Sequence, residues 1–136
     1  MIHQTHTLHF ECTACGQCCH GNPQHHIIEV SKPEVRAFHR FLDISAKQMR
    51  ERYLDDDPDY GLGIRLNADG RCSLLDEQGR CSVYKVRPLQ CQTYPFWPEI
   101  LRSKRAWNQE ASRCEGINQG AAVTMKYIEQ QLRKLR

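Results

Sequence analysis

The sequence predicts a small α+β fold: an irregular cysteine-rich domain in which two capped helices, a short β meander and a C-terminal helix surround a metal centre. The chain has 136 residues, of which 40% are apolar, a composition typical of one ordinary globular domain. Two segments carry complete helix-start signals, and eight cysteines stand out from the rest of the composition. We therefore expect residues 1–136 to form a single domain whose thin apolar core is supplemented by metal.

Three helices are predicted from local signals. The first two begin with a capping box preceded by an apolar residue: Ser31 with Glu34, and Ser45 with Gln48. The acidic run at residues 55–57, followed by Pro58, ends the second helix. An amphipathic C-terminal helix is expected because apolar residues recur at helical spacing at positions 121, 125, 128, 132 and 135.

The extended segments are predicted to be short. Apolar residues around the N-terminal cysteines indicate strands at residues 8–10 and 27–30. Three pieces at residues 64–67, 72–75 and 81–83, separated by turn sequences, predict the meander. Prolines and aromatic residues in 87–98 disfavour long regular structure, whereas residues 99–110 fit a short helix.

The cysteines are the candidate metal ligands. Cys12, Cys15, Cys18 and Cys19 form a CxxCxxCC run, whose two-residue spacers allow neighbouring sulfurs to converge on one metal. The other four candidates are Cys72, Cys81, Cys91 and Cys114. All-sulfur ligation suits zinc, and a CxxCxxC run with one distant cysteine also holds iron–sulfur clusters. The vicinal pair Cys18 and Cys19 favours two sites, because successive extended residues point apart, but the partition of the eight stays open.

The order of these motifs carries a family resemblance. The segment from Phe10 to Cys19, then Gly79–Tyr84 with Arg87-Pro88 and Cys91, and then Tyr94-Pro95-Phe96 resembles the CxxCxxCC cysteine-cluster family over about residues 8–118. The resemblance implies zinc or iron chelation. The same domain type occurs within flagellin lysine methylases, which implies a link to methyl transfer or iron–sulfur chemistry. Because this chain is much shorter, we do not expect methylase activity itself.

Several other residues are candidates for ligation or for packing. His3, His6 and His9 are expected on a mobile terminus without a ligand role. His20 follows Cys19 directly and would complete a site if one cysteine does not ligate. The aromatic segment 94–98 is expected to pack into the core, and Arg87 to offset the negative charge of metal-bound thiolates.

The function predicted from these residues is metal binding, with the metal, zinc or an iron–sulfur cluster, not decided. Two alternatives stay open: an iron–sulfur or metal-dependent enzyme with an open coordination position, and a metal-stapled domain that binds a protein partner. Nucleic acid is not expected, because the basic runs are short and of mixed charge. No apolar run is long enough for a membrane span, and the N-terminus lacks signal-peptide features. We therefore expect a cytoplasmic protein, in which thiols stay reduced.

Overall fold

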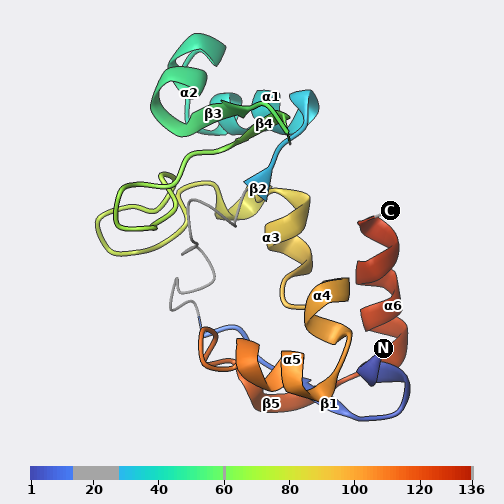
Figure 1. Ribbon diagram of the computed structural model, residues 1–136. Helices are drawn as coiled ribbons and strands as arrows, with labels where there is room; N and C mark the ends of the chain where they lie inside the picture. The colour runs from blue at the N-terminus through green and yellow to red at the C-terminus, as the bar shows by residue number, and fades with distance from the viewer. Residues whose placement is uncertain (14–27, 60, 136) are drawn as a thin grey trace. The chain divides into compact units, whose positions relative to one another are not determined.

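A computed structural model describes residues 1–13, 28–59 and 61–135 of the chain (Figure 1). The chain divides into two compact units, one composed of Met1–Cys18 with Gln92–Arg136 and the other of Cys19–Cys91. Each unit combines helices with a small antiparallel sheet. The predicted α+β class, with its C-terminal helix, is thereby confirmed.

In the unit Cys19–Cys91, both predicted capping boxes are present. Helix α1 (Lys32–Phe41) starts after Ser31, whose hydroxyl oxygen accepts the Glu34 N–H at 3.2 Å while Glu34 Oε1 accepts the Ser31 N–H at 2.9 Å. Helix α2 (Ala46–Tyr53) starts after Ser45, with the same pair of bonds to Gln48, each 3.0 Å long. Such local signals determine where a helix begins because they satisfy N–H groups that have no partner within the helix.

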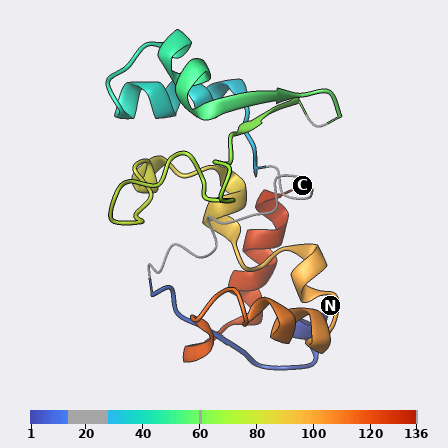
Figure 2. The same ribbon diagram turned by 60° about the vertical axis from the view of Figure 1, so that its left-hand side comes forward.

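The sheet of this unit has three strands in the order β2-β4-β3: β2 (Ile28–Glu29), β3 (Leu54–Asp57) and β4 (Gly61–Ile64). Strands β3 and β4 form an antiparallel pair in which Leu54 is opposite Ile64, and they are drawn in green in Figure 2. The buried apolar side chains of this unit form one core cluster: Val30, Val35, Phe38, Met49, Leu54, Ile64, Leu74 and Val83.

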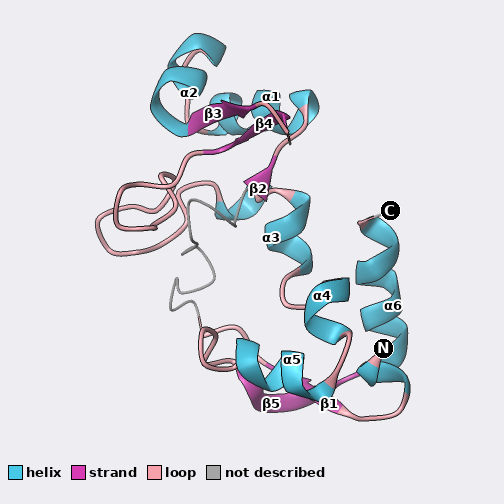
Figure 3. Cartoon of the chain, viewed as in Figure 1, coloured by secondary structure: helices cyan, strands magenta, loops and turns pink. Residues whose placement is uncertain are grey.

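The predicted meander is only partly correct. Within residues 65–83 the pairing is limited to two isolated bridges, Leu66 with Cys72 and Leu75 with Cys81, and Figure 3 draws this part as loop. The extended pairing lies upstream instead, where the acidic run 55–57 forms β3 rather than a simple helix stop. Strand β3 is paired on one side only, and charged side chains are well tolerated on such an edge.

The unit Met1–Cys18 with Gln92–Arg136 contains a second sheet. Strand β1 (Leu8–Phe10) pairs antiparallel with β5 (Ile117–Val123), and the register shifts between His9 and Phe10. Short helices α4 (Pro98–Leu101) and α5 (Lys104–Glu110) occupy the region predicted as one helix. The core cluster of this unit consists of Ile2, Leu8, Phe96, Ile100, Leu101, Trp107, Cys114, Ile117, Ile128 and Leu132.

The C-terminal helix is confirmed but begins later than predicted. Helix α6 (Met125–Lys134) starts after Thr124, whose hydroxyl oxygen accepts the Tyr127 N–H at 3.1 Å. Ala121 belongs to β5, which the sequence analysis did not predict. This strand includes two residues with positive φ, Asn118 and Gly120. They lie where the register with β1 shifts, and the shift interrupts the alternation of apolar and polar residues that would indicate a strand in the sequence.

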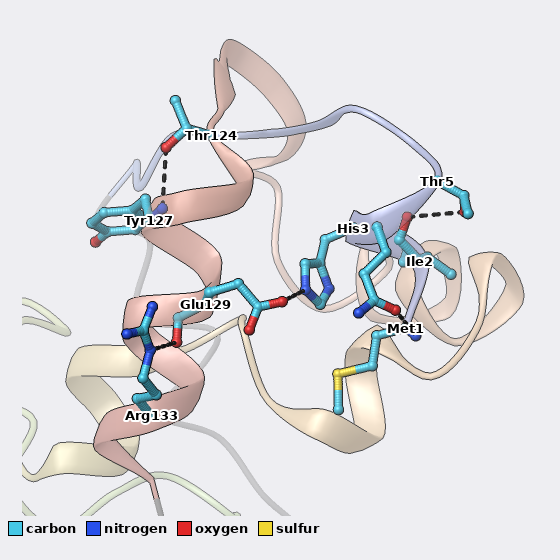
Figure 4. Close-up of polar contacts among 9 residues, drawn as sticks. Met1, Ile2, His3, Thr5, Thr124, Tyr127, Glu129 and Arg133 are labelled. Carbon is cyan, nitrogen blue, oxygen red and sulfur yellow. Dashed lines mark hydrogen bonds and ion pairs between the residues drawn. The ribbon is translucent and has the colours of Figure 1, made fainter.

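The expectation that His3 lies on a mobile, solvated terminus is wrong. His3 belongs to the short 3₁₀ helix η1 (Ile2–Gln4), and only 4% of the residue is exposed. Its Nε2 atom lies 2.7 Å from Glu129 Oε1 of α6, and Figure 4 marks this contact with a dashed line. Ile2, beside it, is part of the apolar core. His6 is exposed, as expected, and its Nδ1 atom lies 2.8 Å from the Thr5 hydroxyl.

The aromatic segment after Cys91 packs as predicted. Phe96 is 2% exposed, stacks on Trp107 with ring centroids 6.1 Å apart, and meets Phe10 edge-on at 5.8 Å. Tyr94 and Trp97 are partly buried against the same cluster. These rings provide much of the core that the short strands alone would not supply. No helix in the described part of the chain is long and apolar enough to cross a membrane.

Candidate metal centre

The structure describes five of the eight predicted ligands: Cys12, Cys72, Cys81, Cys91 and Cys114. Cys15, Cys18, Cys19 and His20 lie outside the described residues. Within residues 1–13, 28–59 and 61–135, no group of three or more His, Cys, Asp or Glu side chains has the arrangement of a metal site. The described cysteines are therefore best considered segment by segment.

The segment that carries Cys12 lies beside the segment that carries Cys114. The Glu11 N–H donates to the Gly116 carbonyl at 3.0 Å, and the Thr13 hydroxyl donates to Glu115 Oε1 at 2.5 Å. These two contacts flank Cys12 on both sides. They bring the first cysteine of the CxxCxxCC run and the last cysteine of the chain, which are far apart in sequence, onto adjacent segments.

The close approach of these two segments requires glycine at position 116. A Cβ atom placed on Gly116 would lie 2.0 Å from the Glu11 carbonyl oxygen and 3.3 Å from the Phe10 ring. Contacts of 2.0 Å do not occur between these atom types, so any other residue would push the Cys12 segment away. The sequence alone does not identify Gly116 as a packing position, because the contact it permits is not local.

Cys12 and Cys114 differ in their exposure. Cys12 is exposed, whereas Cys114 is 7% exposed and belongs to the apolar core cluster. The Cys114 N–H donates to the Glu110 carbonyl at 3.0 Å, so that Cys114 is anchored to the end of α5. The Glu110 carboxylate, with 14% of its side chain exposed, accepts the Tyr94 hydroxyl at 2.5 Å and lies 3.6 Å from Arg113 Nη1. Neither Glu110 nor Glu115 belongs to a motif by which its contacts could be predicted from sequence.

Cys72 and Cys81 come from one hairpin-like loop, as their sequence positions predicted. Cys81 is paired with Leu75, and Cys72 with Leu66, through the two isolated bridges. The turn between them is organised by Asp76, whose Oδ1 atom accepts the N–H groups of Gln78 and Arg80 at 2.9 Å. Both cysteines are half-buried and pack against the apolar cluster of their unit.

Cys91 lies in the short helix α3 (Leu89–Thr93) and is half-buried. The first N–H of this helix, that of Leu89, donates to Glu34 Oε2 at 2.8 Å. Glu34 had been predicted only as part of a capping box, and its second contact could not be read from local sequence. Arg87 lies between η3 (Tyr84–Val86) and α3, with its guanidinium 4.1 Å from the centre of the Tyr84 ring. Its role beside metal-bound thiolates stays a prediction.

The segments that carry the described cysteines lie within the range matched by one protein-family model. The model of the CxxCxxCC family, described as "Putative zinc- or iron-chelating domain", matches residues 11–115. The chain belongs to the CxxCxxCC family. The matched range begins at Glu11 and ends at Glu115, so the two segments that meet around Cys12 are the two ends of the family domain.

A relative of this CxxCxxCC chain is the uncharacterized protein MJ0661 of Methanocaldococcus jannaschii. It is 28% identical over 96 residues, which cover 70% of this chain and 49% of the relative. The chain therefore spans about half the length of that protein. No solved structure matches the chain.

Proposed function

We propose that this chain binds zinc or an iron–sulfur cluster through cysteine thiolates. The proposed ligands are Cys12, Cys15, Cys18, Cys19, Cys72, Cys81, Cys91 and Cys114. The observation that supports this proposal most directly is the pair of contacts around Cys12, Glu11 with Gly116 and Thr13 with Glu115. They keep the start of the CxxCxxCC run beside the Cys114 segment, as a shared site would require.

The surroundings of the described cysteines fit thiolate ligands. Cys72, Cys81 and Cys91 are half-buried and Cys114 is buried, so these sulfurs are held by packed structure while their segments remain loops or a short helix. Structural zinc and iron–sulfur sites are typically built from sulfurs on such knuckles and turns. Bound metal would supply folding energy, and an iron–sulfur cluster would in addition supply electron transfer.

A reducing compartment suits this function. Ligation requires cysteines that are not oxidised to disulfides, and the cytoplasm keeps thiols reduced. We therefore propose a cytoplasmic location.

Metal analysis of the protein purified without oxygen tests the proposal. We expect stoichiometric metal, either zinc in a colourless protein or iron with equimolar sulfide and visible charge-transfer absorption in a brown one. Reconstitution of the metal-free chain with Zn²⁺, and separately with Fe²⁺ and sulfide, distinguishes a metal lost during purification from one that was never bound. Less than one metal ion per two chains after both treatments would contradict the proposal.

A further inference from the structure

Glu34 contacts two segments that are far apart in sequence. Its Oε1 atom accepts the Ser31 N–H at 2.9 Å, which completes the capping box of α1. Its Oε2 atom accepts the Leu89 N–H at 2.8 Å, across 55 positions of sequence. One carboxylate thus serves the starts of two helices, α1 and α3.

Glu34 provides a hydrogen-bond acceptor at the start of helix α3. The first N–H groups of any helix have no partner within it, and they are usually satisfied by the side chain of the preceding residue. That residue is Pro88, whose side chain has no hydrogen-bond acceptor. Glu34 provides an acceptor at Leu89, and Cys91 follows only two residues later in the same short helix.

Glu34 itself is held by the core. The next residue, Val35, is buried, and Phe38, one turn further along α1, has 0% exposure. Both belong to the apolar cluster of the unit Cys19–Cys91. The carboxylate therefore projects from a helix whose position is fixed by packing. Its hydrogen bond with the Leu89 N–H in turn holds the beginning of α3 in place relative to α1.

We propose that Glu34 is a positioning residue, which holds Cys91 in place for metal binding without touching the metal. The inference rests on the proposed role of Cys91 as a ligand. Groups that orient metal ligands through hydrogen bonds typically contribute about 10- to 100-fold in metal affinity. Loss of the Glu34 carboxylate should therefore weaken metal retention by about tenfold or more, in addition to weakening the helix it caps.

Gln48 provides a matched control. It holds the same position in the capping box of α2, its Oε1 atom accepts the Ser45 N–H at 3.0 Å, and α2 packs into the same apolar cluster through Met49. Glu34→Ala and Gln48→Ala therefore remove equivalent capping bonds. Only Glu34→Ala also removes an acceptor from the helix that carries Cys91.

The experiment compares metal content and the rate of metal release to a chromogenic chelator in the purified holoprotein and the two variants. We expect release from Glu34→Ala to be about tenfold or more faster than from the wild type, and release from Gln48→Ala to change less than twofold. Melting temperatures should fall in both variants, and further in Glu34→Ala, because that variant also loses the bond to Leu89 and part of the stabilisation that bound metal provides. If the wild-type protein contains metal but the two variants release it at equal rates, the inference about Glu34 is overturned while the proposed function stands. Wild-type protein without metal would overturn the proposed function as well.

A second pair of variants covers the case in which Glu34→Ala does not fold. Glu34→Gln keeps the size of the side chain but only one acceptor oxygen, so that either Ser31 or Leu89 loses its partner. Gln48→Glu is the reverse exchange and keeps its capping bond. We expect threefold or greater acceleration of metal release in Glu34→Gln and no change in Gln48→Glu. Wild-type release in both variants would overturn the role of Glu34.

Discussion

His3 and Glu129 join the first turn of the chain to the C-terminal helix. Nε2 of His3 lies 2.7 Å from Oε1 of Glu129, and the side chains are 1% and 34% exposed, respectively. The His3 Nδ1 atom is buried, and none of the residues that the structure describes provides a hydrogen-bond partner for it. Glu129, in α6, therefore provides the hydrogen-bond partner of this buried imidazole.

Replacement of His3 by alanine should destabilise the protein. The variant loses a partly buried hydrogen bond, leaves a cavity and removes the side chain that anchors η1 to α6, so we expect a loss of about 1–3 kcal/mol in the free energy of unfolding. Urea denaturation followed by circular dichroism measures this loss. His6→Ala is the control: its side chain is exposed, and its effect should stay within about 0.5 kcal/mol. Metal content should be unchanged in both variants, and metal loss in His3→Ala alone would reveal a ligand role.

Serine at Cys15 or Cys91 should reduce metal content. A neutral hydroxyl is a far poorer ligand for zinc or iron than a thiolate, and an incomplete ligand set also weakens the remaining bonds. Metal per chain is measured by elemental analysis after anaerobic purification, with His6→Ala as the reference. Full occupancy in both serine variants would show that other groups complete the site.

Alanine at Gly116 should separate the Cys12 segment from the Cys114 segment. The added Cβ would lie 2.0 Å from the Glu11 carbonyl oxygen, so the backbone contact between Glu11 and Gly116 must break. We expect a loss of about 1–3 kcal/mol in stability, as for other overpacked sites, together with faster metal release. Gly61→Ala is a suitable comparison, because its φ of +83° makes alanine unfavourable there while nothing lies within 4 Å of the new Cβ. Unchanged metal release in Gly116→Ala would show that Cys12 does not depend on this contact.

Removal of the metal should loosen the cysteine-bearing segments. Structural zinc contributes about 10 kcal/mol or more, which is comparable with the stability of a whole domain. Chelation should therefore lower the melting temperature strongly and increase amide hydrogen exchange in residues 8–30 and 68–98. The capped helices α1 and α2 should be less affected. A melting curve that is unchanged after verified metal removal would contradict a structural role for the metal.

The parts of the fold that were predictable depend on neighbours in sequence. Ser31 with Glu34 and Ser45 with Gln48 form their capping boxes from residues three apart, so the sequence pattern contains the whole interaction. Strand β5 was missed because Asn118 and Gly120 adopt positive φ and interrupt the alternation of apolar and polar residues. The burial of His3 was missed because its partner, Glu129, is 126 positions away.

The candidate site likewise has features that depend on neighbours in sequence and features that depend on distant residues. The cysteines could be singled out as candidate ligands from the sequence, and the turn between Cys72 and Cys81 was also predictable from it. The residues that support them were not: Gly116 acts through a close contact with Glu11, and Glu34 through a bond to Leu89. Such supports have no motif, because their effect depends on the tertiary structure that brings distant segments together.

The aromatic contacts among Phe10, Phe96 and Trp107 give the protein an intrinsic optical reporter. Trp107 is 2% exposed and stacks on Phe96, which in turn meets Phe10, two residues before Cys12. The emission of a buried indole shifts to longer wavelength when water reaches it. A change that displaces the Cys12 segment should therefore alter tryptophan fluorescence in real time, without any label on the thiols themselves.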